Sequence, residues 1–353
     1  MLRLVTLTPK QNAALKILKK NILDGERITV LQGYAGTGKS TVLSFLMEEL
    51  DYESEQVVFC CFTGSATRLL QRKGLNAQTI HSLIYEPIVK RGVCIGFRKR
   101  PWMELSHLAL IVVDEFSMVS DELMTDLQSF GIPLLLVGDQ AQLSAIGAAN
   151  KYINYYDAHL DEVMRQALDN PILWAATKLR QGEILKEGTY GDILFVGRQL
   201  QVQEEWKRKD VQFITGTNAT RNKINLEING SPNIGLNDKI IFLKNDWDEG
   251  VINGTISNIK FFRKGAKAYI LDFVDEMGIA HNEYIAYFQQ PPTQRDQYFD
   301  WAYCLTSTKS QGQTFDCPGV IIDDFYVFRE DKIKHQYVAL TRFTGNYPVA
   351  FLR

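Results

Sequence analysis

The chain has 353 residues, 45% hydrophobic and 23% charged, and this balance predicts a globular protein of about two or three domains with sizeable apolar cores. The net charge of −2 excludes a protein whose whole surface is basic, so any contact with nucleic acid has to be local. No long uncharged apolar run occurs, and Arg3 and Lys10 lie where a signal peptide would need its apolar core, so we expect a cytoplasmic protein with no membrane partner.

The first predicted element is a helix that begins at Pro9, with Thr8 as its N-cap, and runs to about Leu23. Gln11 lies in its first turn. A glutamine amide donates and accepts at once, which matches the N6 and N7 edge of adenine. A single glutamine at a helix start is more often only solvated, so both roles stay open from the residues alone.

The next element is a phosphate-binding loop, GYAGTGKS over 33–40, between the apolar run Ile28 to Leu31 and a helical stretch from Thr41 to Leu50. Its glycines let backbone N–H groups turn toward phosphate oxygens, and the helix adds its positive N-terminal end. We expect Lys39 to reach the β- and γ-phosphates of ATP and Ser40 to bind Mg²⁺. The nucleotide-binding residues predicted here are Gly33, Ala35, Gly36, Thr37, Gly38, Lys39, Ser40 and Thr41.

Three apolar runs then follow, Val57 to Phe62, Leu108 to Val113 and Pro133 to Val137. Strands that are apolar on both faces are typical of a parallel sheet covered by helices, so we predict an α/β fold. The second run ends in Asp114 and Glu115, at the edge where such sheets bind ligands. There Asp114 would bind Mg²⁺ and Glu115 would polarise the attacking water, whereas the alternative is an acidic turn that caps the next helix.

Between these runs, residues 85–102 combine short β-prone stretches with glycines, lysines and arginines. This pattern predicts a basic β-hairpin inserted in the first lobe, with Phe97 beside the run Arg98 to Arg100. A solvated surface hairpin is equally compatible with the local sequence.

The second half begins with a predicted buried strand, Val211 to Thr215, and a helix after it. From about 246 to 290 short alternating strands indicate a small β-barrel or meander, with strands at 256–262, 267–274 and 283–288. Trp247 and Trp301 flank it, where they either stack on bases or pack in the interior. The parallel sheet then resumes at 303–307, 320–322 and 349–352.

In this order the segments resemble the motifs of the superfamily 1B DNA helicases, and among them the RecD-like and Dda-like phage enzymes. On the ATP side the similar segments are the adenine-reading motif at 8–11, motif I at 33–40, motif II at 114–118, motif III at 138–142 with Gln142, an arginine motif at 160–166 with Arg165, and motif VI at 337–342 with Arg342. On the DNA side they are motif Ia at 63–66, motif Ib at 79–82 and motif V, with Thr306 and the segment 309–314.

The resemblance implies two RecA-like motor domains, the first at 1–84 and 103–165 around a hairpin at 85–102, the second at 166–245 and 296–353 around an SH3-like barrel at 246–295. The place of the hairpin between motifs Ib and II favours a pin that separates duplex strands over a solvated surface hairpin. It assigns catalysis to Lys39, Glu115, Gln142, Arg165 and Arg342, and it adds Gln11, Asp114, Gln142 and Gly312 to the cofactor-binding residues. Two arginines so far apart suit a site that closes between two lobes, although a surface ion pair is the commoner fate of either alone. The DNA-binding residues expected are Thr63, Gly64, His81, Phe97, Asn218, Thr306 and Lys309.

The resemblance implies an ATP- and Mg²⁺-dependent DNA helicase that moves 5′ to 3′ on single-stranded DNA and unwinds forked duplex DNA, and the direction rests on the resemblance alone. The helicase would be a monomeric motor in the cytoplasm, in the host cytoplasm if a phage encodes it, with a single-strand-binding protein or replisome component as a protein partner. Two other classes stay open. A P-loop phosphotransferase would have an ATPase indifferent to DNA, and a DNA-loading switch would hydrolyse ATP slowly without moving.

Overall fold

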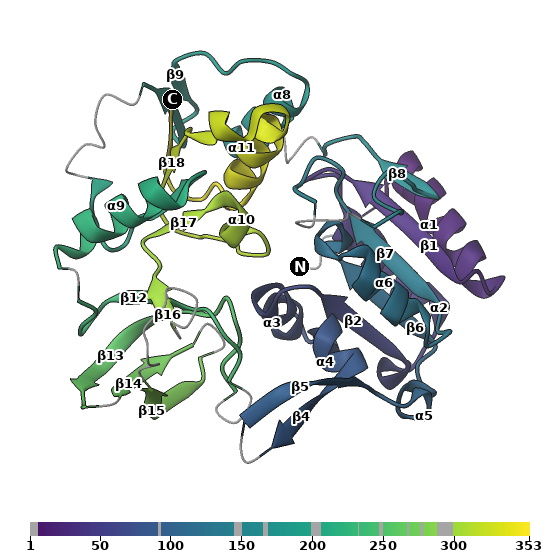
Figure 1. Cartoon of the computed structure of the whole chain (residues 1–353). Helices are drawn as coiled ribbons and strands as arrows, with labels where there is room; N and C mark the ends of the chain where they lie inside the picture. The colour runs from purple at the N-terminus through teal and green to yellow at the C-terminus, as the bar shows by residue number, and fades with distance from the viewer. Residues whose placement is uncertain are drawn as a thin grey trace. The chain divides into compact units, whose positions relative to one another are not determined.

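The computed structural model describes residues 6–90, 93–144, 150–164, 169–198, 206–231, 233–246, 250–266, 268–275, 278–287 and 299–353. The chain divides into two compact units, one of residues 1–62 and 66–169 and the other of residues 63–65 and 170–353. Figure 1 shows the helices and strands of both.

The first unit is built on a parallel sheet with strand order β3-β2-β6-β7-β1-β8. Its strands are β1 (Ile28–Gly33), β2 (Val57–Cys61), β3 (Ala77–Thr79), β6 (Leu110–Asp114), β7 (Leu134–Gly138) and β8 (Ala158–Leu160). Its helices are α1 (Pro9–Leu23), α2 (Lys39–Leu50), α3 (Gly64–Arg72), α4 (Ile80–Ile84), α5 (Trp102–Leu105) and α6 (Asp121–Gln128), with short 3-10 helices η1 (Ser54–Gln56) and η2 (Phe116–Met118).

Helices cover both faces of this sheet, which explains why its central strands are apolar throughout. In β2, Val57 and Phe59 pack in a core with α1, α2 and α3, whereas Val58 and Cys60 pack in a second core with α4, α5 and α6. Successive side chains of a strand point to opposite faces, so a strand between two helical layers needs apolar residues at every position. The predicted parallel sheet is therefore confirmed, and each apolar run, 57–62, 108–113 and 133–137, contains most of one strand.

Between α4 and α5, strands β4 (Tyr85–Lys90) and β5 (Val93–Lys99) pair antiparallel as a two-stranded ribbon (Figure 1). Its base is tied to the first unit, since Lys99 forms an ion pair with Asp126 of α6 at 2.6 Å.

The second unit has a sheet of order β17-β11-β18-β19-β10-β9, parallel except for the pair of β10 with β9. Its strands are β9 (Gly188–Tyr190), β10 (Leu194–Gly197), β11 (Gln212–Thr215), β17 (Cys304–Thr306), β18 (Gly319–Ile322) and β19 (Val349–Leu352). Its helices are α8 (Pro171–Arg180), α9 (Asn218–Asn229), α10 (Ser307–Ser310), η5 (Phe325–Asp331) and α11 (Lys332–Thr341). Ile224 and Ile228 of α9 pack on this sheet, and α8 packs against α11.

A separate antiparallel sheet of order β15-β14-β13-β12-β16 belongs to the same unit. Its strands are β12 (Lys239–Phe242), β13 (Ile256–Lys264), β14 (Ala268–Val274), β15 (Ala280–Tyr287) and β16 (Phe299–Trp301). They enclose an aromatic core in which Phe242 lies 4.8 Å from Phe273 and 5.6 Å from Tyr284, measured between ring centroids. The three strands expected at 256–288 lie in this sheet. Trp247 is outside the described residues, and Trp301 is half-buried against the core under α9.

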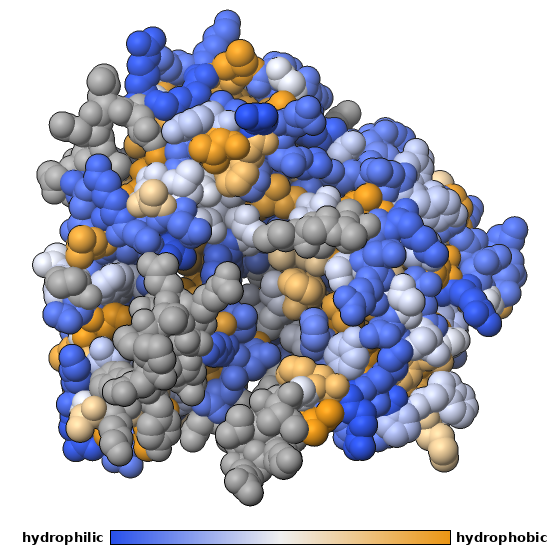
Figure 2. Space-filling model, viewed as in Figure 1, coloured by the Kyte–Doolittle hydropathy of each residue, from blue (hydrophilic) through white to orange (hydrophobic). Residues whose placement is uncertain are grey.

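The coloured part of the face drawn in Figure 2 is mostly hydrophilic, with hydrophobic residues scattered over it. Among the described residues, no helix combines the length and apolar character that crossing a membrane requires.

Candidate functional site

The glycine-rich loop joins the end of β1 to the start of α2. Gly36 and Gly38 have φ angles of 76° and 87°, in the left-handed region that glycine adopts without strain. Thr37 anchors the loop, because its backbone N–H and its hydroxyl both donate to the carbonyl of Tyr34, at 3.3 and 2.8 Å. Of the other predicted residues, Gly33 ends β1, Ala35 lies in the turn and Thr41 lies in the first turn of α2.

Lys39 is the first residue of α2, and its ammonium lies over the loop. Its Nζ donates to the carbonyls of Gly33 at 2.6 Å and Tyr34 at 3.1 Å. These contacts hold the cation at the loop, where a polyphosphate would bind. Ser40, the next residue, is exposed at the start of the same helix.

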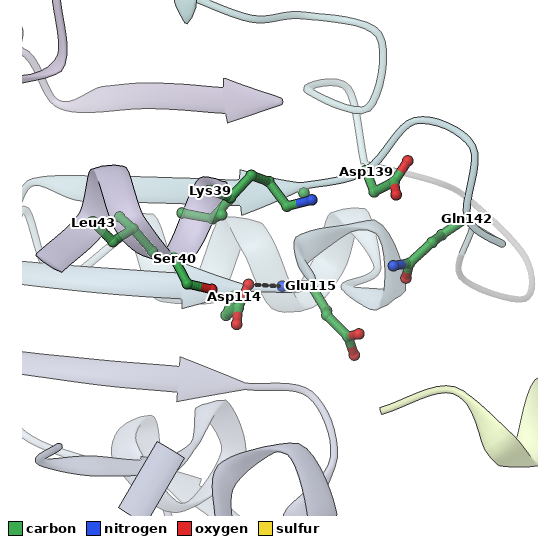
Figure 3. A pocket seen from close by; sticks show the side chains of 9 residues that line it. Lys39, Ser40, Leu43, Asp114, Glu115, Asp139 and Gln142 are labelled. Atoms are coloured by element: carbon green, nitrogen blue, oxygen red, sulfur yellow. Dashed lines mark hydrogen bonds between the residues drawn. The ribbon is translucent and has the colours of Figure 1, made fainter. Parts of the chain in front are cut away.

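Six of the side chains that line one pocket come from the ends of three elements (Figure 3). Lys39 and Ser40 extend from α2, Asp114 and Glu115 from the end of β6, and Asp139 and Gln142 from the segment after β7. Because β6 and β7 are parallel neighbours, their carboxyl ends meet at the same edge of the sheet. Five residues that the sequence analysis predicted as site residues thus lie together in the fold although three separate segments supply them. They are Lys39, Ser40, Asp114, Glu115 and Gln142.

Asp114 and Glu115 are both half-buried at the end of β6. Burial raises the pKa of the Asp114 carboxyl above its usual range, and the Lys39 ammonium partly offsets this by lowering that pKa. The Oδ1 of Asp114 accepts the backbone N–H of Glu115 at 3.0 Å. Glu115 has φ 52° and ψ 40°, which turns the chain sharply at the end of β6.

Gly138, the last residue of β7, has a packing role at this site. A Cβ at this position would lie 2.6 Å from Cε1 of Phe116, so the Phe116 ring occupies the space that a side chain would need. Phe116 is fully buried and follows Glu115 directly. The absence of a side chain at 138 therefore allows the turn that carries Glu115 to pack against the sheet.

The donor set suits Mg²⁺ bound together with a nucleotide. Among the described residues, no group of three or more histidine, cysteine, aspartate or glutamate side chains could hold a metal ion alone. Mg²⁺ is usually bound through one or two protein ligands together with substrate phosphates. The hydroxyl of Ser40 and the carboxylate of Asp114, which line the same pocket, fit that pattern, and a cation would offset the cost of burying Asp114.

Gln11 is buried, whereas a residue that contacts the adenine base would be accessible from the pocket. Its side chain is 3% exposed. Oε1 accepts the backbone N–H of Thr8 at 3.0 Å, and Nε2 donates to the carbonyl of Thr37 at 3.0 Å and approaches the sulfur of Met164 at 3.5 Å. The amide thus joins the start of α1 to the phosphate loop, and a Cβ at Gly38 would lie 2.2 Å from its Nε2. In this structure Gln11 is neither merely solvated nor turned toward the pocket.

In the second unit, the buried Arg342 follows α11 directly. Its Nε donates to the carbonyl of Val338 at 3.3 Å and its Nη1 to that of Gln313 at 3.2 Å, so it is tied to the segment that contains Gly312. Thr306 is buried at the end of β17, where its hydroxyl caps α10 by accepting the backbone N–H of Lys309 at 3.3 Å.

Asn218 is exposed as the first residue of α9. Strands β11 and β17 are parallel neighbours, with Thr215 opposite Thr306, so the starts of α9 and α10 lie at the same edge of this sheet. Burial lowers the pKa of the Lys309 ammonium, and the nearby guanidinium of Arg221 lowers it further. Arg221 is itself paired with Asp300 at 3.0 Å.

The DNA-binding candidates of the first half are Thr63, Gly64, His81 and Phe97, and the first three follow the ends of the neighbouring strands β2 and β3. Thr63 and Gly64 lie at the start of α3, and His81, which is exposed in α4, has its ring centroid 6.2 Å from that of Phe62. Phe97 of β5 is 54% exposed. The three cations after it are all paired with carboxylates, Arg98 with Glu86 at 2.8 Å, Lys99 with Asp126 at 2.6 Å and Arg100 with Glu104 at 2.9 Å.

One predicted residue, Arg165, lies outside the described residues. The sequence analysis included Asp139 in motif III without giving it a role. Its Oδ1 accepts the backbone N–H of Ala141 at 2.9 Å, in the turn that leads to Gln142. The position of Asp139 beside Gly138 at the end of an apolar run was the available signal. The sequence analysis missed Asn150, whose amide contacts the turn after Glu115 and for which the sequence offers no signal.

Comparisons with known proteins agree with this site. The family model described as the AAA domain matches residues 6–193, just over half of the chain. The ATP-dependent RecD2 DNA helicase of Deinococcus radiodurans is 37% identical over 170 residues, which cover 46% of this chain and 23% of that protein. The ATP-dependent DNA helicase dda of Enterobacteria phage T4 is 28% identical over 191 residues, which cover 50% of this chain and 43% of that protein. The chain thus spans less than half the length of either relative.

A solved structure, described as the basis for DNA unwinding at forked double-stranded DNA by two coordinating Pif1 helicases, has a similar fold. Its TM-score is 0.63 at 18% identity, and the likeness covers 98% of this chain and 92% of that one. At this identity the likeness supports the fold, an α/β arrangement with a RecA-like parallel-sheet core. The predicted resemblance to RecD-like and Dda-like helicases is confirmed by the two sequence relatives.

Proposed function

The chain belongs to the AAA domain family, and we propose that it is an ATP-dependent DNA helicase. It moves 5′ to 3′ along single-stranded DNA and unwinds forked duplex DNA in replication, recombination or repair. The observation that carries the proposal is the pocket at the edge of the first sheet, which a phosphate-loop lysine and serine line together with Asp114, Glu115 and Gln142. RecD2 and dda, which resemble this chain, are both named ATP-dependent DNA helicases.

We assign residues 1–84 and 103–165 to a first RecA-like domain, and 166–245 with 296–353 to a second. Residues 85–102 form an inserted pin and residues 246–295 an SH3-like domain. The antiparallel pairing of β4 with β5, and the separate antiparallel sheet with its own aromatic core, support these two insertions. The parallel sheet of each main unit supports the pair of RecA-like domains.

The pocket residues divide the chemistry of hydrolysis. Lys39 offsets the charge of the β- and γ-phosphates, and the backbone of 33–38 surrounds their oxygens. Ser40 and Asp114 would hold Mg²⁺, and the ion would neutralise part of the phosphate charge. Glu115 accepts a proton from the attacking water, and Gln142 orients that water or the γ-phosphate. Arg165 and Arg342 stabilise the γ-phosphate charge that develops in the transition state.

The DNA track runs over Thr63, Gly64, His81, Asn218, Thr306 and Lys309. In the second unit, the starts of α9 and α10 lie at the ends of neighbouring strands, which supports a shared phosphate-contacting edge. Phe97 is exposed on β5, which supports contact with a base pair at the fork.

The test is ATP hydrolysis measured with and without single-stranded DNA, in the wild type and in Lys39→Ala. The proposal predicts hydrolysis that DNA stimulates and that Lys39→Ala abolishes. Hydrolysis indifferent to DNA would instead indicate a phosphotransferase on a small substrate, and hydrolysis that survives Lys39→Ala would show that the pocket is not the ATPase site.

A further inference from the structure

Glu115 adopts a backbone conformation that a residue with a side chain seldom takes. Its φ of 52° and ψ of 40° place it in the left-handed region, where β6 ends and η2 begins. There its Cβ crowds the following carbonyl, so the conformation carries a steric cost and persists only when the surrounding structure fixes it. The direction of the Glu115 side chain therefore depends on whatever holds the turn after it.

Two backbone hydrogen bonds lie within the turn. The backbone N–H of Met118 donates to the carbonyl of Glu115 at 3.1 Å, and that of Val119 donates to the carbonyl of Phe116 at 3.0 Å. η2 is three residues long, and hydrogen bonds in 3-10 turns have poorer geometry than those of an α-helix. The buried ring of Phe116, which packs against Gly138, also contributes to holding the turn.

Asn150 supplies two further hydrogen bonds from a segment beyond β7. Its side chain is 1% exposed, and its Nδ2 donates to the carbonyl of Phe116 at 3.1 Å and to that of Val119 at 2.8 Å. Its Oδ1 accepts the backbone N–H of Tyr152 at 3.1 Å. Both amide hydrogens are thus used to bridge the two ends of the turn, a geometry that an ionised carboxylate, which has no hydrogen to donate, cannot replace.

We propose that Asn150 is a positioning residue for ATP hydrolysis. By bridging the carbonyls of Phe116 and Val119, it keeps Glu115 in the left-handed conformation that presents its carboxylate to the pocket. Asn150 acts through Glu115 and not by contact with the nucleotide. The inference rests on the proposed function, since it takes Glu115 as the group that activates water.

The first test is Asn150→Ala, assayed by DNA-stimulated ATP hydrolysis. We expect kcat to fall on the order of 10- to 100-fold, because a small displacement of a reacting group has an effect of that size. KM for ATP should stay near the wild-type value, because Lys39, Ser40 and Asp114 are unchanged. Asn150→Ser, which keeps one hydrogen-bond donor, should have a kcat between those of the wild type and Asn150→Ala. If Asn150→Ala does not fold, the kcat and KM of Asn150→Ser test the inference in its place.

The second test separates positioning from general stability. In a Glu115→Gln background, Asn150→Ala should cause no further loss of kcat, because the carboxylate that it positions is already gone. The control for a general loss of stability is Ile22→Ala. Ile22 packs from α1 into the core on one face of the sheet, remote from the turn, so this variant should have a kcat near that of the wild type.

Three results would overturn the inference: an unchanged kcat in Asn150→Ala, an undiminished loss in the Glu115→Gln background, or an equal loss in Ile22→Ala. If Glu115→Gln itself hydrolyses ATP like the wild type, the role of Glu115 fails, and with it the proposed chemistry rather than the position of Asn150 alone.

Discussion

Replacing Gln11 by alanine should weaken the use of ATP and GTP by the same factor. In the structure the Gln11 amide binds the phosphate loop directly, because its Nε2 donates to the carbonyl of Thr37 at 3.0 Å, and its Oε1 accepts the backbone N–H of Thr8. The substitution leaves the buried Thr37 carbonyl without this donor, which costs about 1–3 kcal/mol. If this free energy destabilises the loop conformation that binds phosphates, nucleotide affinity drops about 5- to 150-fold. Phosphates are common to all nucleoside triphosphates, so the loss should not depend on the base.

The assay is kcat/KM for ATP and for GTP in the wild type and in Gln11→Ala, with Lys10→Ala as the matched control. Lys10 is the adjacent residue, and its ion pair with Asp161 is exposed, so its removal should leave both values near wild type. A loss confined to ATP would refute the reasoning, because it would show that Gln11 leaves Thr37 and reads adenine when the nucleotide is bound.

Three further predictions concern the second unit and the ribbon. Arg342→Ala should retain ATP binding and lose roughly 10³-fold or more in hydrolysis rate. A normal rate would show that the arginine has a structural role, such as its contacts with Val338 and Gln313. Replacing residues 93–100 by a short Gly-Ser turn, or Phe97 by alanine, should leave DNA-stimulated hydrolysis nearly intact but strongly reduce unwinding. The reason is that stacking of Phe97 on a base is worth about 1–3 kcal/mol. An equal loss of hydrolysis and of unwinding would show that the ribbon is part of the core of the unit. His335 is buried and stacked on Phe328, and burial lowers its pKa from 6.5 to about 4. Below about pH 6.5 the His335 imidazole is therefore protonated in the unfolded chain but stays neutral in the folded one, so the free energy of unfolding decreases as pH falls from about 6.5 toward 4. His335→Gln should make thermal stability depend less on pH, measured as the melting temperature at pH 7 and pH 5.

The elements that the sequence predicts well are those in which burial leaves little choice of residue. β2, β6 and β7 are covered on both faces, so their apolar runs are continuous, and Asp114 and Glu115 end one of them. The convergence of Lys39, Asp114 and Gln142 follows from the rule that parallel strands present their carboxyl ends together. The pocket could therefore be predicted from the order of its segments.

What could not be predicted depends on contacts between distant segments. β8 is three residues long with a histidine in its middle, too short for periodicity to indicate a strand. The basic run after Phe97 is paired with carboxylates, one of which, Asp126, lies on a helix that the local sequence cannot place beside it. Gln11 and Asn150 are single amides whose roles come from the carbonyls that they meet, and no local pattern identifies those partners.

The most direct test of the central claim is strand separation with ATP, using duplexes that carry either a 5′ or a 3′ single-stranded tail, with Lys39→Ala as the inactive control. The account predicts that the wild type separates the duplex with the 5′ tail and not the one with the 3′ tail, and that Lys39→Ala separates neither. Hydrolysis stimulated by DNA without separation of either duplex would contradict the claim and identify the chain as an ATPase switch.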